Sequence, residues 1–157
     1  MYQLIKKQFI GSDLATCWNF FSSPENLQAI TPDYMGFKII SDLPEKMYEG
    51  MMIKYKVSPL LGIPMTWVTE IKTVKEGVFF VDEQRQGPYK MWHHEHHFEE
   101  VEGGVLMTDV VSYILPFGFI GKLFSPILVE PKLRGIFDYR YEKVEQLFNV
   151  KASALNG

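Results

Sequence analysis

Through most of the chain, short runs of alternating apolar and polar residues are separated by turns rich in Gly, Pro and Ser. This period of two predicts β-strands that each bury one face. The strands predicted in this way cover residues 2–10, 37–41, 50–57, 65–74, 78–84, 89–101 and 105–115. Tight connections such as Glu102-Gly103-Gly104 indicate hairpins, so neighbouring strands should run antiparallel.

Between the first two predicted strands the apolar spacing changes from two to three and four. Ser12-Asp13 offers a helix N-cap, and the apolar residues that follow predict a helix ending near Ser22. A second short helix is predicted from Pro24 to Ile30, because Pro is favoured in the first turn of a helix.

The C-terminal part of the chain again has helical spacing. From Phe119 to Phe148, apolar residues recur every three or four positions. Pro126 and Pro131 should bend or restart this helix, because Pro cannot donate the intrahelical hydrogen bond. Residues 151–157 show no pattern and are expected to form a disordered tail.

These elements predict one α+β domain over residues 1–150. An antiparallel sheet of this size has an apolar face to cover, and the C-terminal helix is the only large element left to cover it. We therefore expect a curved sheet packed on a long helix, with a cavity between them. Aromatic residues make up 15% of the chain, more than a minimal core needs, which favours a bulky core or an aromatic-lined pocket.

Composition excludes several other classes of protein. The net charge is −3 and no run of Lys or Arg occurs, so a nucleic-acid partner is not expected. No apolar stretch reaches about 18 residues, so no integral membrane segment is expected. Cys17 is the only cysteine, which excludes an internal disulfide and favours a reducing compartment. Since the N-terminus lacks the order of a secretory signal, we expect a cytoplasmic protein. No nucleophile-elbow, P-loop, dinucleotide-binding or helical zinc-protease motif is present.

All four histidines lie within residues 93–97, in a predicted strand. Strand alternation places His94 and His96 on the same face as Trp92 and Phe98, and residues 93, 95 and 97 on the other. The face that carries the two aromatic residues is the better candidate for the inner one. His94 and His96 should then point inward, where each ring needs a polar partner, whereas residues 93, 95 and 97 should be solvated.

Three roles for the inner histidines remain open. They could bind a metal ion, contact a ligand or move a proton within a cavity, or only hydrogen-bond to neighbouring strands. A metal site would need a further ligand such as Asp82 or Asp109. Because the chain has no further His pair and no Cys cluster, we expect no metal and no other cofactor.

Other strand residues are candidates for a pocket wall. Tyr55, Trp67, Gln84 and Tyr113 combine a large or amphipathic side chain with a position on a predicted strand. Core packing is the alternative role for each of them. Asp109 shares a face with apolar residues; if that face is inner, the carboxylate needs a donor such as His94 or His96, and if it is outer, the carboxylate is solvated.

Three segments carry a family resemblance. They read Phe80-x-Asp82-x-Gln84-x-x-Gly87-Pro88-Tyr89-x-x-Trp92-x-His94-x-His96-x-Phe98, then Thr108-Asp109-x-Val111-x-Tyr113-x-Leu115-Pro116-x-Gly118, then Ile136-Phe137-Asp138-Tyr139-Arg140. Together they resemble the START-like superfamily, also called SRPBCC, and especially its bacterial polyketide cyclase/dehydrase-like and ligand-binding members. The likeness extends from the first strand to about Phe148.

The resemblance implies a helix-grip fold, in which a seven-stranded antiparallel sheet, with two small helices after its first strand, wraps around a long C-terminal helix. It also implies a cavity for an apolar or aromatic small molecule such as a lipid, sterol, polyketide or hormone. It does not imply a mechanism, because members of this superfamily differ widely in function.

Our leading hypothesis is a protein that binds a small hydrophobic ligand between sheet and helix. The expected wall consists of Tyr55, Trp67, Trp92 and Tyr113, with the polar contacts Gln84, His94, His96 and Asp109. One alternative is a polyketide cyclase or dehydratase in which His94 or His96 moves a proton and Asp109 orients it. Another is an interaction or stress-related protein without turnover.

Overall fold

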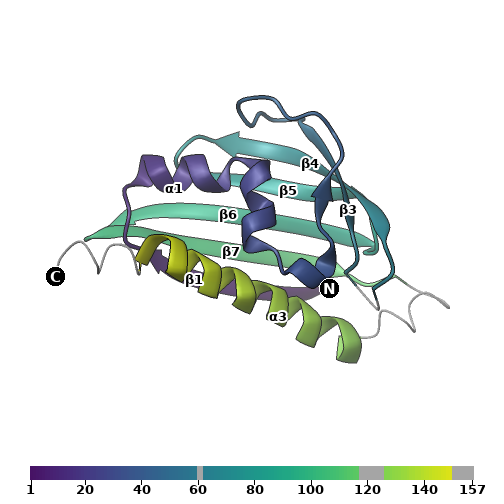
Figure 1. Cartoon of the computed structure of the whole chain (residues 1–157). Helices are drawn as coiled ribbons and strands as arrows, with labels where there is room; N and C mark the ends of the chain where they lie inside the picture. The colour runs from purple at the N-terminus through teal and green to yellow at the C-terminus, as the bar shows by residue number, and fades with distance from the viewer. Residues whose placement is uncertain (60–61, 117–125, 150–157) are drawn as a thin grey trace.

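A seven-stranded antiparallel sheet forms the framework of the protein (Figure 1). The computed structural model describes residues 1–59, 62–116 and 126–149. The strands are β1 Tyr2–Ile10, β2 Lys38–Ile39, β3 Met52–Val57, β4 Met65–Lys75, β5 Phe79–Gln86, β6 Met91–Val101 and β7 Gly104–Ile114. From β2 to β7 each strand pairs with the next along the chain, and β1 pairs with β7.

All seven predicted strands are present, most with ends shifted by one or two residues. The predicted and observed lengths differ most for β2, which has two residues instead of the five predicted at 37–41. Beyond the end of β2, a side chain replaces the backbone as the acceptor: Oγ of Ser41 accepts a hydrogen bond from the backbone N–H of Lys54 at 3.0 Å. The backbone ladder between β2 and β3 stops there.

The segment between β1 and β2 contains the predicted short helices. α1 covers Leu14–Phe21, and the carboxylate of Asp13 caps it by accepting the backbone N–H of Thr16 at 2.9 Å. The second helix, η1, covers Pro24–Ile30 but is a 3₁₀-helix. A further 3₁₀ turn, η2 at Asp33–Met35, was not predicted.

The C-terminal helix α3 covers Pro126–Val144 and continues as a π-helical turn, η3, at Glu145–Asn149. The helix does not restart at Pro131, which lies inside the continuous helix at an exposed position. The predicted start of this helix at Phe119 and the predicted tail 151–157 lie outside the described residues. No described helix is long and apolar enough to cross a membrane.

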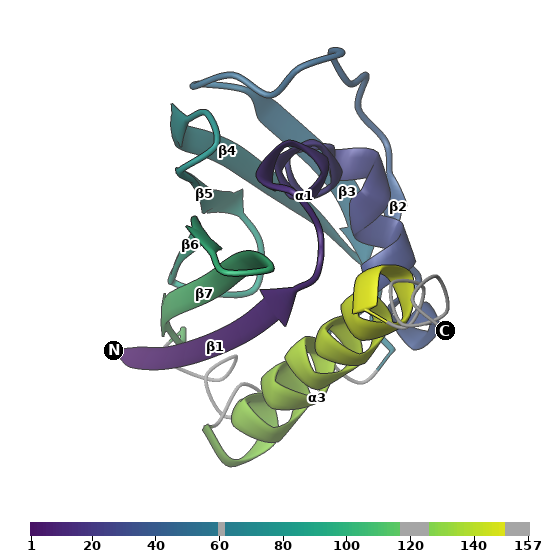
Figure 2. The ribbon, with the colours of Figure 1, turned by 90° about the vertical axis from the view of Figure 1, so that its left-hand side faces the viewer.

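The sheet is strongly curved, and Figure 2 shows α1, η1 and α3 on its concave side. Side chains of α3 such as Leu133 and Phe137 are buried against this side. Along β6 and β7, buried and partly exposed residues alternate, and the buried face carries both apolar residues and the polar residues His94, His96 and Asp109. The structure thus confirms the predicted helix-grip architecture.

Gly104 marks a close approach between two strands at the turn from β6 to β7. A Cβ atom at this position would lie 2.2 Å from the backbone oxygen of Ile10 in β1. Because this neighbour is backbone and cannot move aside cheaply, we expect Gly104→Ala to lower the free energy of unfolding by about 1–3 kcal/mol. Thermal and urea unfolding of the purified protein would measure this loss.

Gly135 provides the matched control, because it lies in α3 and a Cβ atom at this position would have no neighbour within 4 Å. Gly135→Ala should stabilise the protein by up to about 1 kcal/mol, the helix-propensity difference. A Gly104→Ala variant as stable as the wild type would show that the β1–β7 approach is not constrained by backbone contact.

Candidate functional site

A cavity of about 160 Å³ lies between the concave side of the sheet, the short helices and α3. Most of its wall is apolar. The aromatic side chains in the wall include Tyr55, Trp67, Tyr89, Trp92 and Phe137, and the polar ones include Thr69, Asp82, His94, His96 and Arg140. The wall therefore combines broad aromatic surfaces with a small polar region, which is the usual composition of a small-molecule site.

The aromatic part of the wall is a chain of ring contacts centred on Trp67. Its ring stacks on Tyr55 at 6.0 Å and meets Trp92 edge-on at 5.4 Å, and Tyr89 lies 5.7 Å away. The hydroxyl of Tyr55 hydrogen-bonds to Thr69 at 2.9 Å. Burial raises the pKa of both Tyr55 and Tyr89, so both phenols stay protonated at neutral pH.

Most of the residues proposed from the sequence for this site lie in the wall. They are Tyr55, Trp67, Trp92, His94 and His96. Gln84, Asp109 and Tyr113 are not among the wall residues, and each has another environment.

Gln84 closes the connection between β5 and β6. Its amide nitrogen donates to the backbone oxygen of Tyr89 at 2.7 Å, and its amide oxygen accepts the backbone N–H of Tyr89 at 3.2 Å. These two bonds use the side chain as a bridge across the turn.

Tyr113 is buried, and its ring stacks on that of Tyr2, the first residue of β1, with the ring centres 5.4 Å apart.

Asp109 lies directly behind the two inner histidines, as part of a buried cluster. Its Oδ1 is 2.9 Å from Nε2 of His94 and 3.0 Å from Nδ1 of His96. On the other side, Oδ2 of Asp82 is 2.9 Å from Nε2 of His96 and 3.5 Å from Nδ1 of His94. The two rings lie 3.8 Å apart, so they are held between one carboxylate behind them and one in the cavity wall.

The cluster is buried, and the pKa values of its two histidines shift in opposite directions. His94, His96 and Asp109 are 4%, 7% and 7% exposed. Burial lowers the pKa of His94, helped by the nearby charge of His96. Burial acts in the same sense on His96, but the nearby carboxylates of Asp109 and Asp82 outweigh it and raise its pKa. Of the two rings, His96 therefore keeps its extra proton to the higher pH.

Both carboxylates of the cluster are held in the ionised form. Burial by itself would raise the pKa of Asp109, but the hydrogen bonds and charges of His94 and His96 hold it far below its usual range. The pKa of Asp82 is lowered for the same reason, with the charge of His94 opposing the effect of burial. The cavity wall therefore carries a fixed anionic group beside two imidazoles.

Three buried side-chain nitrogens in the described part of the chain have no hydrogen-bond partner. They are Nε1 of Trp67, Nδ1 of His96 and Nε of Arg140, and all three residues line the cavity. Nδ1 of His96 does lie close to Asp109, but out of line for a hydrogen bond. Because buried donors are nearly always paired, Trp67 and Arg140 leave two donors for a molecule in the cavity.

Sequence reasoning missed Arg140 and Phe137 as site residues. Both belong to the family-like segment of α3 and lie three residues apart, on one face of the helix. The Arg140 guanidinium lies 4.9 Å from the centre of the Phe137 ring, and that ring meets His94 edge-on at 5.5 Å. The helical spacing of these residues was visible, but not which face of the helix would meet the histidines.

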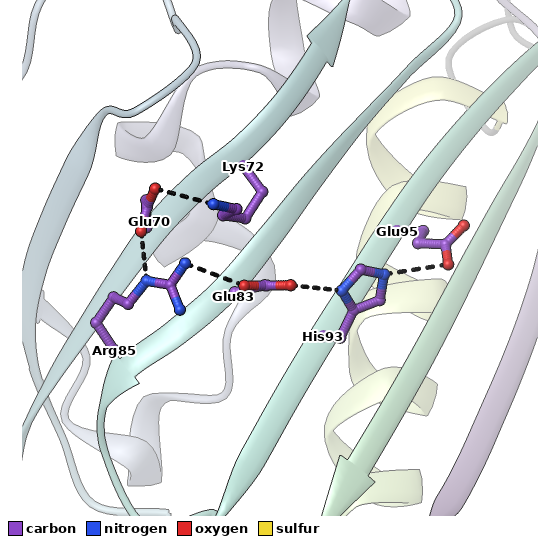
Figure 3. A network of polar contacts seen from close by, with 6 residues as sticks. All are labelled: Glu70, Lys72, Glu83, Arg85, His93 and Glu95. Atoms are coloured by element: carbon purple, nitrogen blue, oxygen red, sulfur yellow. Dashed lines mark hydrogen bonds and ion pairs between the residues drawn. The ribbon is translucent and has the colours of Figure 1, made fainter.

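The odd-numbered residues of the histidine segment lie on the opposite face of the sheet, as strand alternation predicts. Figure 3 shows His93 between Glu83 and Glu95, at 2.9 and 3.2 Å. Arg85 forms ion pairs with both Glu83 and Glu70 and so extends this network to β4. These partly exposed pairs contribute little to stability individually and are separated from the cavity by the sheet.

Comparison with known proteins identifies the fold. No protein-family model and no curated protein matches the chain. Among solved structures, protein CV1439 from Chromobacterium violaceum matches with a TM-score of 0.71 and 11% identity over 94% of this chain and 98% of that one. Protein Ms6760 from Mycobacterium smegmatis matches with a TM-score of 0.67 and 15% identity, covering 96% and 92%.

A plant protein has the same architecture. Major latex-like protein 151 from Panax ginseng matches with a TM-score of 0.64 and 15% identity, over 94% of this chain and 97% of that one. At such identities the similarity concerns the fold and not the activity. The sheet and the C-terminal helix of this chain, together with these neighbours, show that it has a START-like, helix-grip fold.

Proposed function

We propose that the protein binds one small aromatic molecule that is mostly apolar and carries an acceptor oxygen. The observation behind this proposal is the pair of unpartnered donors, Nε1 of Trp67 and Nε of Arg140, in the wall of an otherwise apolar cavity. An apolar molecule alone would leave both donors without a partner, at a cost of about 1–3 kcal/mol each. A carbonyl or carboxylate oxygen would satisfy them.

The size of the cavity supports a compact ligand. An engineered apolar cavity of about 150 Å³ in another protein admits benzene, and the cavity here measures about 160 Å³. A molecule of one or two rings fits this space better than a long acyl chain. The edges and faces of Trp67, Trp92 and Tyr89 provide the stacking surfaces that such rings prefer.

Arg140 favours an anionic acceptor. Its guanidinium lies in the cavity wall on α3, where it is half-buried. A carboxylate placed beside it gains a charge-assisted hydrogen bond, which is stronger than one between neutral groups. We therefore expect an aromatic carboxylate to bind more tightly than the corresponding hydrocarbon.

Two measurements test the proposal. Native mass spectrometry after gentle purification should show a co-purified small molecule or, after its removal, one equivalent of added 2-naphthoate. Equilibrium dialysis with 2-naphthoate and naphthalene should then give saturable binding of both, tighter for the carboxylate. If neither probe binds saturably and no co-purified molecule is found, the binding function is wrong.

Trp67→Phe isolates the contribution of the indole N–H. Phe is smaller than the indole but keeps an aromatic surface in the wall, so naphthalene should bind within about twofold of the wild type. The affinity for 2-naphthoate should fall about tenfold, as expected for one hydrogen bond to a charged acceptor. The same dialysis measurement gives both values.

Trp18→Phe is the matched control for this variant. Trp18 is as buried as Trp67, at 7% exposed, but it packs on Phe80 and Phe98 and does not line the cavity. Its replacement should change neither affinity. An equal loss for both probes in Trp67→Phe would mean that the indole acts only by its shape.

A further inference from the structure

We propose that Asp82, His94 and His96 form a binding site for a divalent transition-metal ion such as Zn²⁺, open to the cavity. One ligand atom from each of the three residues can be chosen so that all lie within 4.8 Å of one another. This site goes beyond the ligand-binding function and does not depend on it.

The distances between the near atoms suit a shared ion. Oδ2 of Asp82 lies 2.9 Å from Nε2 of His96 and 3.5 Å from Nδ1 of His94. Ligands that each bind Zn²⁺ at about 2.1 Å are separated by roughly 3.0–3.4 Å at octahedral to tetrahedral angles. An ion between the three residues would draw their side chains closer together, because their ligand atoms span up to 4.8 Å.

The far nitrogens of both rings lie close to a single carboxylate, although only that of His94 is in line for a hydrogen bond with it. Oδ1 of Asp109 lies 2.9 Å from Nε2 of His94 and 3.0 Å from Nδ1 of His96. In metal sites, a ligating histidine commonly donates its other N–H to such a carboxylate, which fixes the tautomer and aims the lone pair at the ion. In the structure Nε2 of His96 hydrogen-bonds to Asp82, so an ion at this site would require the proton of that ring to sit on Nδ1, beside Asp109. The near nitrogens of both rings would then have lone pairs to coordinate the ion.

A divalent cation would also compensate the negative charge of the two carboxylates in the cluster. The buried carboxylate of Asp109 and the partly buried one of Asp82 lie beside two imidazoles, and a buried charge is costly unless it is compensated. One ion of charge +2 balances Asp82 and Asp109 while both rings stay neutral. Arg140 also lines the cavity and acts against a cation, but among the described residues it forms no ion pair with Asp82.

The position of the site determines its type. Asp82, His94 and His96 line the cavity, whereas Asp109 lies behind them. Three protein ligands leave at least one coordination position facing the cavity, as in metal sites that bind water or a small molecule rather than purely structural ones. The sequence named Asp82 and Asp109 as possible further ligands but disfavoured a metal because the chain has no further His pair and no Cys cluster. The pairing of Asp82 with His94 across β5 and β6 brings the Asp82 carboxylate to the histidines.

The test uses full-length protein freed of metal by a chelator and then titrated with Zn²⁺ by calorimetry. We expect one ion per chain in the wild type. His94→Gln and Asp82→Asn should each weaken binding by at least about 100-fold, and Asp109→Asn by about 10- to 100-fold. Circular dichroism would establish that each variant is folded.

The double variant His93→Gln/His97→Gln is the matched control, because it removes two histidines from the outer face of the same strand. It should bind Zn²⁺ like the wild type. Binding that is lost in this double variant and kept in His94→Gln would overturn the proposal, as would no stoichiometric binding in the wild type. Either result would return the inner cluster to an acid–base or structural role.

A second readout covers the case in which the inner variants do not fold. Co²⁺ added to the wild type and to His93→Gln/His97→Gln should give the same visible absorption bands. It should also quench tryptophan fluorescence equally in both, because the ring of Trp92 lies 6.1 Å from that of His94. Absorption and quenching lost in the outer-face variant would contradict the inner site. Naphthalene binding, measured separately, distinguishes failure of this proposal from failure of the ligand-binding function.

Discussion

Asp109→Ala should lower the free energy of unfolding at neutral pH by about 3–5 kcal/mol, the loss typical of breaking a buried charged pair from one side. The Asp109 carboxylate is 7% exposed and accepts the Nε2–H of His94 at 2.9 Å. Removing it leaves His94 without its acceptor and His96 without the nearby negative charge, and it leaves an empty space behind both rings. Urea unfolding of the chelator-treated protein measures the loss without a contribution from bound metal.

The pH dependence provides an internal check on this prediction. The folded-state pKa values of Asp82 and Asp109 lie below the ordinary value of 3.8. Groups of this kind stabilise the fold at pH values above their unfolded pKa, and this stabilisation is lost as the pH falls below about 4. The difference between wild type and Asp109→Ala should therefore shrink in acid.

The histidines should affect the neutral range less. The pKa of His96 is raised, so its stabilisation is present below about pH 6.5 and is lost as the pH rises through its folded pKa. The pKa of His94 is lowered, so it acts in the opposite direction. The contribution of His96 therefore grows as the pH falls toward about 6.5, and that of His94 reduces stability as the pH falls further.

Asp109→Asn is the conservative control, because it keeps the shape and one acceptor oxygen but removes the charge. It should be less destabilised than Asp109→Ala at neutral pH. A loss below about 1 kcal/mol in Asp109→Ala would show that the cluster is not held together by this carboxylate.

Phe137→Ala should have a similarly large effect, also about 3–5 kcal/mol, because it removes a buried ring from the contact between α3 and the sheet. Phe137 is 3% exposed, meets His94 edge-on at 5.5 Å and carries the Arg140 guanidinium 4.9 Å above its ring. For a chain of this length the loss corresponds to a decrease in Tm of roughly 6–20 °C. Differential scanning calorimetry would measure it.

Ile127→Ala is the control on the same helix. Ile127 is 85% exposed, so its truncation should change stability by less than about 0.5 kcal/mol. Phe137 also lines the cavity, so the Ala variant should accept ligands larger than naphthalene if enough of it folds. Equal stability of the two variants would mean that the packing of this ring does not stabilise the contact between α3 and the sheet.

Local patterns in the sequence were sufficient for the elements and for the inward face of β6. The alternation of residues 92–98 correctly placed His94 and His96 inside and His93 outside. The N-cap at Asp13 was equally visible. These features follow from the periods of two and 3.6 and from short-range capping, which depend on neighbouring residues alone.

The composition of the site depended on contacts that no local pattern contains. Whether Asp109 faced inward was open from the sequence, and Gln84, expected in the wall, instead bridges the β5–β6 turn. Asp82 became a partner of the histidines only through the pairing of β5 with β6, and Arg140 reached the cavity only through the rotation of α3. Strand register and helix rotation are set by packing between distant segments, so only the tertiary structure decided them.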